Sequence, residues 1–257
     1  MKAMRRVSAV VSLALGAVLL CSVVPASAQN KLEPHYRPLK PDGAGPFPTL
    51  MLLPGCGGVS SAHRGRAEAL KAQGYFIVTV DFVAARGLQT MCGKVAQYFR
   101  EIATQDIRDT LAYLKAQPLV DQSAIGALGW STGGGAIIYA LAAAPAEQPP
   151  FRAAVMFYPI CRGLRPWKGN TPGLMLLGSL DDVNLPKYCQ DLANEMPGGT
   201  LEVRTYEGAR HVFDDHNLGS KVPFLGTMTV GYHREAATQA WDQTTKFLAT
   251  HLKSKGN

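Results

Sequence analysis

Several features typical of nucleic-acid-binding, metal-binding or multidomain proteins are missing from this sequence. Beyond residue 28 no run of Lys and Arg stands together, and the charges are scattered, so we expect no nucleic-acid binding. No two cysteines have the C-x-x-C spacing typical of zinc or redox sites, and we expect no metal. No internal repeat or low-complexity linker divides the chain, which favours a single domain over residues 29–257.

The first residues have the layout of an export signal. A basic head precedes an apolar run over residues 7–24, and a small-x-small pattern comes next at residues 26–28. This order predicts a signal peptide over residues 1–28, cleaved after Ala28. An uncleaved membrane anchor is the alternative, and the cleavage pattern argues against it. We expect an exported mature protein, periplasmic or secreted, with no stable membrane anchor.

The mature chain alternates short apolar runs with amphipathic stretches. Apolar strands of this kind are typical of a parallel sheet that is buried on both faces. Helices are expected between them, including one with Ile102, Ile107 and Leu111 on its inner face and a last one after Tyr232. The pattern predicts an α/β fold, a doubly wound and mostly parallel sheet with helices on both faces. The predicted strands are 48–53, 75–80, 124–128, 153–158, 173–177 and 201–206.

The segment Gly129–Gly133 fits the G-x-S-x-G nucleophile elbow, with Ser131 as the nucleophile. A buried strand leads into the motif, and an apolar helix opens directly after it. This context matters because the elbow holds the hydroxyl at the carboxyl end of a sheet, beside the positive end of a helix. A glycine-rich turn with a surface serine is the structural alternative.

The elbow also predicts the order of its partners, first an acidic residue and then a histidine, each after a late strand. His211 fits the base, and Asp181 or its neighbour Asp182 fits the acid, with Asp181 preferred. His216 is the second choice for the base. A buried, merely structural His211 is the alternative.

An oxyanion hole needs a second backbone donor from the loop after an early strand. The glycine-rich segment Pro54–Gly58 occupies that place, and its glycines allow close approach of a substrate. We expect the donors to be the backbone N–H groups of Cys56 and Thr132. An ordinary tight turn is the alternative.

With these elements placed, residues 38–252 resemble the dienelactone hydrolase family of α/β-hydrolases. The resemblance implies hydrolysis of a small-molecule ester or lactone without a cofactor, through an acyl-enzyme, and it supports Ser131, Asp181 and His211. Ser131 stands where the founding members carry cysteine, and Pro54 where many relatives carry histidine. The motifs that carry the likeness are residues 45–48, 54–58, 80–81, 86–87, Cys92, 113–118, 129–134, 178–182, 208–214 and 232–252.

Three further residues are candidates for substrate contact. Arg86 lies in the loop after a strand, and in dienelactone hydrolases an arginine in a similar loop pairs with the substrate carboxylate. The alternative is a solvated surface arginine. Trp130 and Phe213 flank the nucleophile and the base, and either could line the acyl pocket or pack in the core.

Four cysteines remain after the predicted cleavage, and an oxidising compartment favours their pairing. Cys56 and Cys92 each follow a strand near the sheet centre, whereas Cys161 and Cys189 follow two neighbouring late strands. We expect the disulfides Cys56–Cys92 and Cys161–Cys189, with buried free cysteines as the alternative.

The same triad also serves other functions. An acyltransferase or a peptidase would use it with a different nucleophile or substrate, and a non-catalytic binding protein would keep only the fold. The presence of all four elements in their expected order favours a carboxylic ester or lactone hydrolase.

Overall fold

The computed structural model describes residues 30–196 and 198–253. The predicted signal peptide therefore lies outside the described residues. Within the described ranges, none of the helices combines the length and the apolar character needed to span a bilayer.

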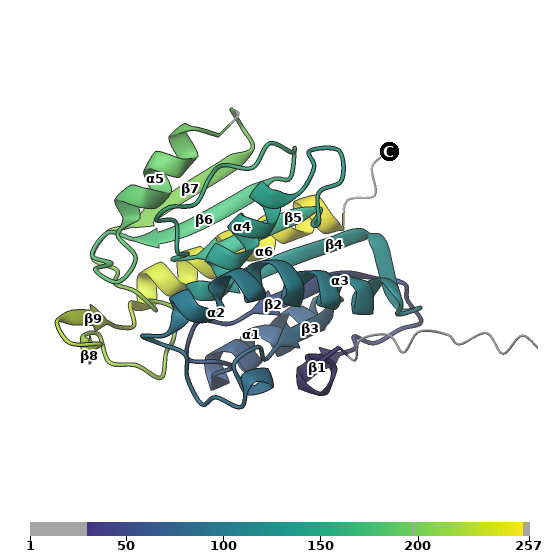
Figure 1. Ribbon diagram of the computed structural model, residues 1–257, viewed down its shortest axis with the longest axis horizontal. Helices are drawn as coiled ribbons and strands as arrows, with labels where there is room; N and C mark the ends of the chain where they lie inside the picture. The colour runs from purple at the N-terminus through teal and green to yellow at the C-terminus, as the bar shows by residue number, and fades with distance from the viewer. Residues whose placement is uncertain (1–29, 197, 254–257) are drawn as a thin grey trace, which may run out of the picture.

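A seven-stranded sheet with the order β1-β3-β2-β4-β5-β6-β7 forms the centre of the molecule (Figure 1). Strands β2 to β7 run parallel to their neighbours, and β1 is antiparallel to β3 at one edge. Parallel strands bring their carboxyl ends to the same edge, where ligands bind in open α/β sheets. The strands are β1 (Tyr36–Leu39), β2 (Phe47–Leu53), β3 (Phe76–Val80), β4 (Val120–Trp130), β5 (Ala153–Phe157), β6 (Gly173–Gly178) and β7 (Leu201–Tyr206).

Helices cover both faces of this sheet, because alternate side chains of each buried strand point to opposite sides. In β2, Leu50 and Leu52 join one apolar cluster with residues of α1 and α6, and Met51 and Leu53 join another with residues of α3, α4 and α5. The predicted fold class is confirmed. The helices are α1 (Ser61–Ala72), α2 (Val95–Glu101), α3 (Ile107–Lys115), α4 (Thr132–Ala143), α5 (Pro186–Asn194) and α6 (Arg234–Leu252).

The helix expected to carry Ile102, Ile107 and Leu111 on its inner face is interrupted by a π-helical turn, Ile102–Asp106, between α2 and α3. Ile102 and Ile107 are both buried although they lie five residues apart. The wider turn accounts for this spacing, because it adds one residue between two positions that face the core.

Some short elements were not predicted. The four-residue edge strand β1 and the helix α5 were not predicted. A separate two-stranded hairpin, β8 (Val222–Phe224) and β9 (Met228–Val230), projects from one end of the molecule in Figure 1. Three-residue strands are too short to show an alternating pattern.

Candidate active site

Ser131 occupies the sharp bend between β4 and α4, with φ 48° and ψ −110°, which non-glycine residues rarely adopt. Close packing requires the motif's two glycines. A Cβ on Gly129 would lie 2.6 Å from the backbone of Gly133, and a Cβ on Gly133 would lie 2.1 Å from the carbonyl oxygen of Leu53. The bend is therefore held by the close packing of α4 against β2 and β4, and it turns Ser131 toward the carboxyl end of the sheet.

The structure brings three of the predicted residues into one chain of hydrogen bonds. Ser131 Oγ lies 3.0 Å from His211 Nε2, and His211 Nδ1 lies 2.7 Å from Asp181 Oδ2. All three residues are buried, with exposed fractions of 9%, 3% and 3%. An ionised Asp181 only accepts hydrogen bonds, so Nδ1 carries the proton and Nε2 is left to accept one from the serine hydroxyl. This arrangement suits general-base activation of the hydroxyl.

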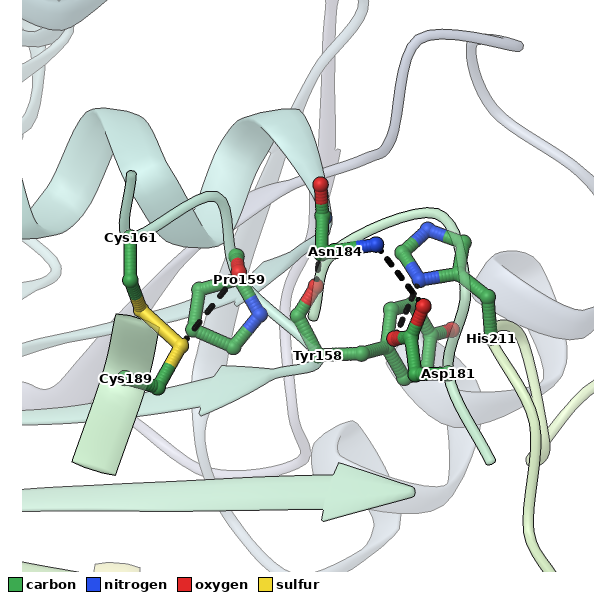
Figure 2. Close-up of a disulfide and its surroundings, with 7 residues drawn as sticks. All are labelled: Tyr158, Pro159, Cys161, Asp181, Asn184, Cys189 and His211. Atoms are coloured by element: carbon green, nitrogen blue, oxygen red, sulfur yellow. Dashed lines mark hydrogen bonds and ion pairs between the residues drawn. A yellow bond between two sulfur atoms is a disulfide. The ribbon is translucent and has the colours of Figure 1, made fainter. Parts of the chain in front are cut away.

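Asp181 is oriented by its own loop after β6. Its second oxygen, Oδ1, accepts the backbone N–H groups of Val183 and Asn184, at 2.9 Å and 2.8 Å. The Asn184 side chain in turn donates to the Tyr158 carbonyl at 3.0 Å, which ties this loop to the one after β5 (Figure 2). Both carboxylate oxygens of Asp181 are therefore held in place.

Asp182 and His216, the other candidates for the acid and the base, do not join this chain of hydrogen bonds. Asp182 is exposed, and its carboxylate accepts hydrogen bonds from Thr229 instead of His211. His216 lines a neighbouring cavity that Ser131 does not line.

The next residue after the base, Val212, has φ 62°, a strained conformation for a β-branched side chain. The strain lies beside the imidazole that the chain must present to Ser131.

Two residues of the site were missed by the sequence analysis, Tyr158 and Asp214. The Tyr158 ring stands edge-on to His211, 4.6 Å between centroids, and its hydroxyl donates to Asp214 Oδ1 at 2.6 Å. Trp130 Nε1 donates to the other oxygen of Asp214 at 3.1 Å. Burial, reinforced by the charge of Asp214, raises the pKa of Tyr158 well above its ordinary value, so the phenol stays a donor. The place of Tyr158 at the end of the predicted buried strand 153–158 was the available signal.

A cavity of about 330 Å³ opens in front of Ser131. One wall is the loop Gly55–Gly58, which we call the glycine-loop wall, together with the disulfide that joins Cys56 to Cys92. Another wall consists of the hairpin residues 222–224 and Val230, which we call the hairpin wall. Most of the lining is apolar, which suits a small apolar ester or lactone.

The predicted oxyanion donors lie at the expected elements. Cys56 lines the cavity, and its carbonyl accepts the Met91 N–H at 2.9 Å. Thr132 is the first residue of α4, where backbone N–H groups have no partner within the helix. Both amides thus remain candidates for stabilising negative charge beside Ser131.

His63 also lines the cavity, 4.6 Å from the Trp130 ring. Its Nδ1 accepts the Ser60 N–H at 3.0 Å, and Ser60 in turn caps the start of α1, so the pair forms a capping box. Burial lowers the pKa of His63, against the opposing charges of Asp214 and Asp215. The ring is therefore neutral near pH 7, and Nε2 carries its proton.

Arg86 requires a correction, because it does not line the cavity. Its guanidinium binds both oxygens of Asp106, at 2.9 Å and 3.2 Å, and also contacts Glu101 at 3.1 Å. Asp106 lies on the buried π-helical turn, and burial raises its pKa, against the attraction of Arg86. A buried carboxylate needs such a partner, so the arginine is engaged in the core.

Phe213 requires the same correction. It is fully buried and packs against the rings of Phe157, Tyr158 and Tyr206, and it does not line the cavity. Trp130, by contrast, does line it. The direction of each side chain decides whether it faces the cavity or the core, and residue spacing alone does not reveal that direction.

Both disulfides form with the predicted pairing, Cys56–Cys92 and Cys161–Cys189. The second connects the loop after β5 to α5, close to Tyr158 and Asp181 (Figure 2). Among residues 30–196 and 198–253, no three His, Cys, Asp or Glu side chains gather as metal ligands.

The parallel sheet, the strained serine between strand and helix, and the histidine after the last sheet strand define the α/β-hydrolase class. The sequence matches the dienelactone hydrolase family over residues 36–252. The chain therefore belongs to the dienelactone hydrolase family, and it is a hydrolase of the carboxylic ester or lactone type.

Solved structures share this architecture. An esterase from the Planctomycetes species Thermogutta terrifontis is 21% identical, with 86% of this chain and 90% of that chain covered and a TM-score of 0.60. A dienelactone hydrolase-like promiscuous phosphotriesterase from metagenomic libraries is also 21% identical, with 84% and 98% covered and a TM-score of 0.61. Likenesses at this identity show the fold. No curated protein matches the sequence.

Proposed function

We propose that the protein is an exported serine hydrolase that cleaves small carboxylic esters or lactones through Ser131, His211 and Asp181. The observation that carries the proposal is the buried chain of hydrogen bonds from Ser131 through His211 to Asp181, at the foot of an apolar cavity. Family membership supports the reaction class.

The reaction would proceed by acyl transfer to the serine. As Ser131 Oγ bonds to the substrate carbonyl carbon, its proton passes to His211 Nε2, and Asp181 stabilises the resulting imidazolium. The backbone amides of Cys56 and Thr132 would receive the oxyanion. The proton then passes to the leaving alcohol as the C–O bond breaks. Water then attacks the acyl carbon with His211 as the base, and the acid product leaves as its bond to Ser131 Oγ breaks and His211 returns the proton to that oxygen.

Export is supported by the chemistry of the cysteines. Two disulfides persist in oxidising compartments and are rare in the cytosol. The N-terminal pattern of basic head, apolar run and small residues agrees with this route. The disulfide pair and the N-terminal pattern are independent arguments for the same location.

A labelling experiment tests the catalytic role. The mature protein is treated with a fluorophosphonate probe, which reacts with an activated serine, alongside Ser131→Ala and a series of nitrophenyl esters. We expect wild type to be labelled and to hydrolyse the esters, and Ser131→Ala to do neither. Unlabelled wild type, or undiminished labelling of Ser131→Ala, would reject the proposal in favour of a non-catalytic binding protein.

A second experiment distinguishes a hydrolase from a peptidase or an acyltransferase that uses the same triad. Nitrophenyl esters, a matched peptide amide and an added alcohol acceptor are offered to the same enzyme. The apolar cavity favours ester cleavage with water as the acceptor. Preferential amide cleavage would indicate a peptidase, and a product ester formed from the added alcohol would indicate an acyltransferase.

A further inference from the structure

The hairpin wall stands apart from the seven-stranded sheet. Strands β8 and β9 pair with each other in a separate two-stranded sheet, at the end of the molecule shown at the lower left of Figure 1. Their residues Val222, Pro223, Phe224 and Val230 nevertheless line the cavity. The position of the hairpin therefore sets how wide the cavity is.

The hairpin is attached near its base to the loop of the triad histidine. Val230 forms an isolated bridge with His211, and the Gly231 N–H donates to the His211 carbonyl at 3.0 Å. This contact fixes the end of β9. It leaves the strand's middle, and the turn beyond it, to be held by other groups.

Asp182 supplies that second attachment. Its Oδ1 accepts the Thr229 N–H at 2.9 Å, and its Oδ2 accepts the Thr229 hydroxyl at 3.1 Å. The Thr229 hydroxyl also accepts a hydrogen bond from Arg210 at 2.9 Å. Hydrogen bonds to a carboxylate are stronger than those between neutral groups. The middle of β9 is thus bound to the loops that follow β6 and β7.

Two adjacent carboxylates consequently divide two tasks. Asp181 turns inward to His211, and Asp182 turns outward to Thr229. The turn of the hairpin beyond this attachment carries Leu225, which is 51% exposed. An exposed turn of this kind has little buried surface to resist an outward movement of the hairpin wall once the carboxylate is removed.

We propose that Asp182 is a specificity-determining positioning residue, which holds the hairpin wall against the cavity and so limits the length of the ester that the enzyme accepts. The inference rests on the proposed function. Removing the carboxylate would release β9, widen the cavity and favour longer esters. Asp182 would act through Val222, Phe224 and Val230 and would not touch the reacting atoms.

The test compares nitrophenyl acetate with nitrophenyl octanoate on the full mature protein. For Asp182→Ala we expect the octanoate-to-acetate ratio of kcat/KM to rise at least fivefold, mainly through a lower KM for octanoate. Asp182→Asn retains an acceptor for the Thr229 N–H and should fall between the two. The matched control is Asp191→Ala, which removes an exposed carboxylate of α5 that pairs with Lys187 on the same helix.

Hydrogen exchange over residues 222–230 gives a readout that does not depend on activity. We expect faster exchange in Asp182→Ala than in wild type or Asp191→Ala. If Asp182→Ala fails to fold, Thr229→Val serves instead, because it removes the hydroxyl donor and keeps the shape of the side chain. An ester ratio within twofold of wild type overturns the specificity role, even where exchange accelerates, and unchanged exchange overturns the attachment itself. Failure of wild type to react with the fluorophosphonate overturns the proposed function instead.

Discussion

The two walls of the cavity are built in opposite ways. The glycine-loop wall is covalently tied through Cys56–Cys92, and the Cys56 carbonyl is held by the Met91 N–H. The hairpin wall is held non-covalently, by hydrogen bonds of Asp182 and Arg210 to Thr229 and by backbone contacts of Val230 and Gly231 with His211. A donor aimed at a developing charge must be placed within a fraction of an ångström, whereas the part of a substrate remote from the reaction tolerates looser contact. The difference predicts that changes to the first wall affect the rate, and changes to the second affect substrate choice.

The largest effect is expected at Ser131 and His211, which line the cavity together with both walls. Ser131→Ala and His211→Ala each remove the proposed nucleophile or base and should lower kcat by about 10⁴-fold or more. Steady-state hydrolysis of nitrophenyl acetate measures this, with thermal unfolding to show that the variants remain folded. A folded Ser131→Ala enzyme with more than a tenth of wild-type activity would contradict the site.

The next largest effect is expected for a substitution in the nucleophile elbow, behind the glycine-loop wall. Gly133→Ala places a Cβ 2.1 Å from the Leu53 carbonyl oxygen, a backbone atom, so strands and helix must separate. We expect a loss of about 3 kcal/mol in the free energy of unfolding, measured by urea denaturation, together with a marked loss of activity.

Gly65→Ala is the matched control for that substitution. Gly65 lies in α1, and a Cβ there would meet nothing within 4 Å. Since alanine favours a helix over glycine, this variant should be as stable as wild type or more stable by about 0.5 to 1 kcal/mol. Equal losses in the two variants would show that close packing at the elbow is not the cause.

The two disulfides sharpen the comparison of the walls. They span similar separations, 36 and 28 residues, so removing either pair by Cys→Ala should cost a similar free energy of unfolding, about 2 to 4 kcal/mol. Only Cys56→Ala with Cys92→Ala releases the proposed oxyanion loop, and we expect kcat to fall about tenfold more than in the Cys161 and Cys189 double variant. Equal kcat values at a temperature where both are folded would refute the positioning role of the first disulfide.

The smallest effect concerns His63 beside the glycine-loop wall. Burial lowers its pKa in the folded state, so below about pH 6.5 the unfolded chain binds a proton that the folded chain does not. The free energy of unfolding therefore falls as the pH falls through this range. His63→Gln keeps a capping box with Ser60 but does not titrate. Urea denaturation between pH 5 and 7.5 should show a shallower decline for this variant, and equal slopes would contradict the burial.

The sequence predicted the elements whose signal is local. The elbow around Ser131 has a fixed spacing, and the structure brings this serine into contact with His211 as expected. The choice between Asp181 and Asp182 depends on side-chain direction in a loop, which spacing does not encode. Arg86, one of the candidates for substrate contact, is bound instead to Asp106, which lies on a π-helical turn that the pattern of apolar residues does not reveal.

The missed parts share another property, since each depends on contacts distant in the sequence. Tyr158 and Trp130 meet on Asp214, at separations of 56 and 84 residues. The hairpin has strands of three residues, and its place over the cavity is set by Asp182, 47 residues away from Thr229. Long-range polar contacts of this kind leave no periodic trace in a single sequence.

The position of α6 has a consequence for how the molecule folds. This last helix packs Phe247, Leu248 and Leu252 against the same sheet face as Leu50 and Leu128. Without α6, that face is covered only in part, by α1, even though strands β1 to β7 are complete by residue 206. The core on this side of the sheet is therefore completed only when α6 packs against strands that precede it in the chain, β2 and β4 among them.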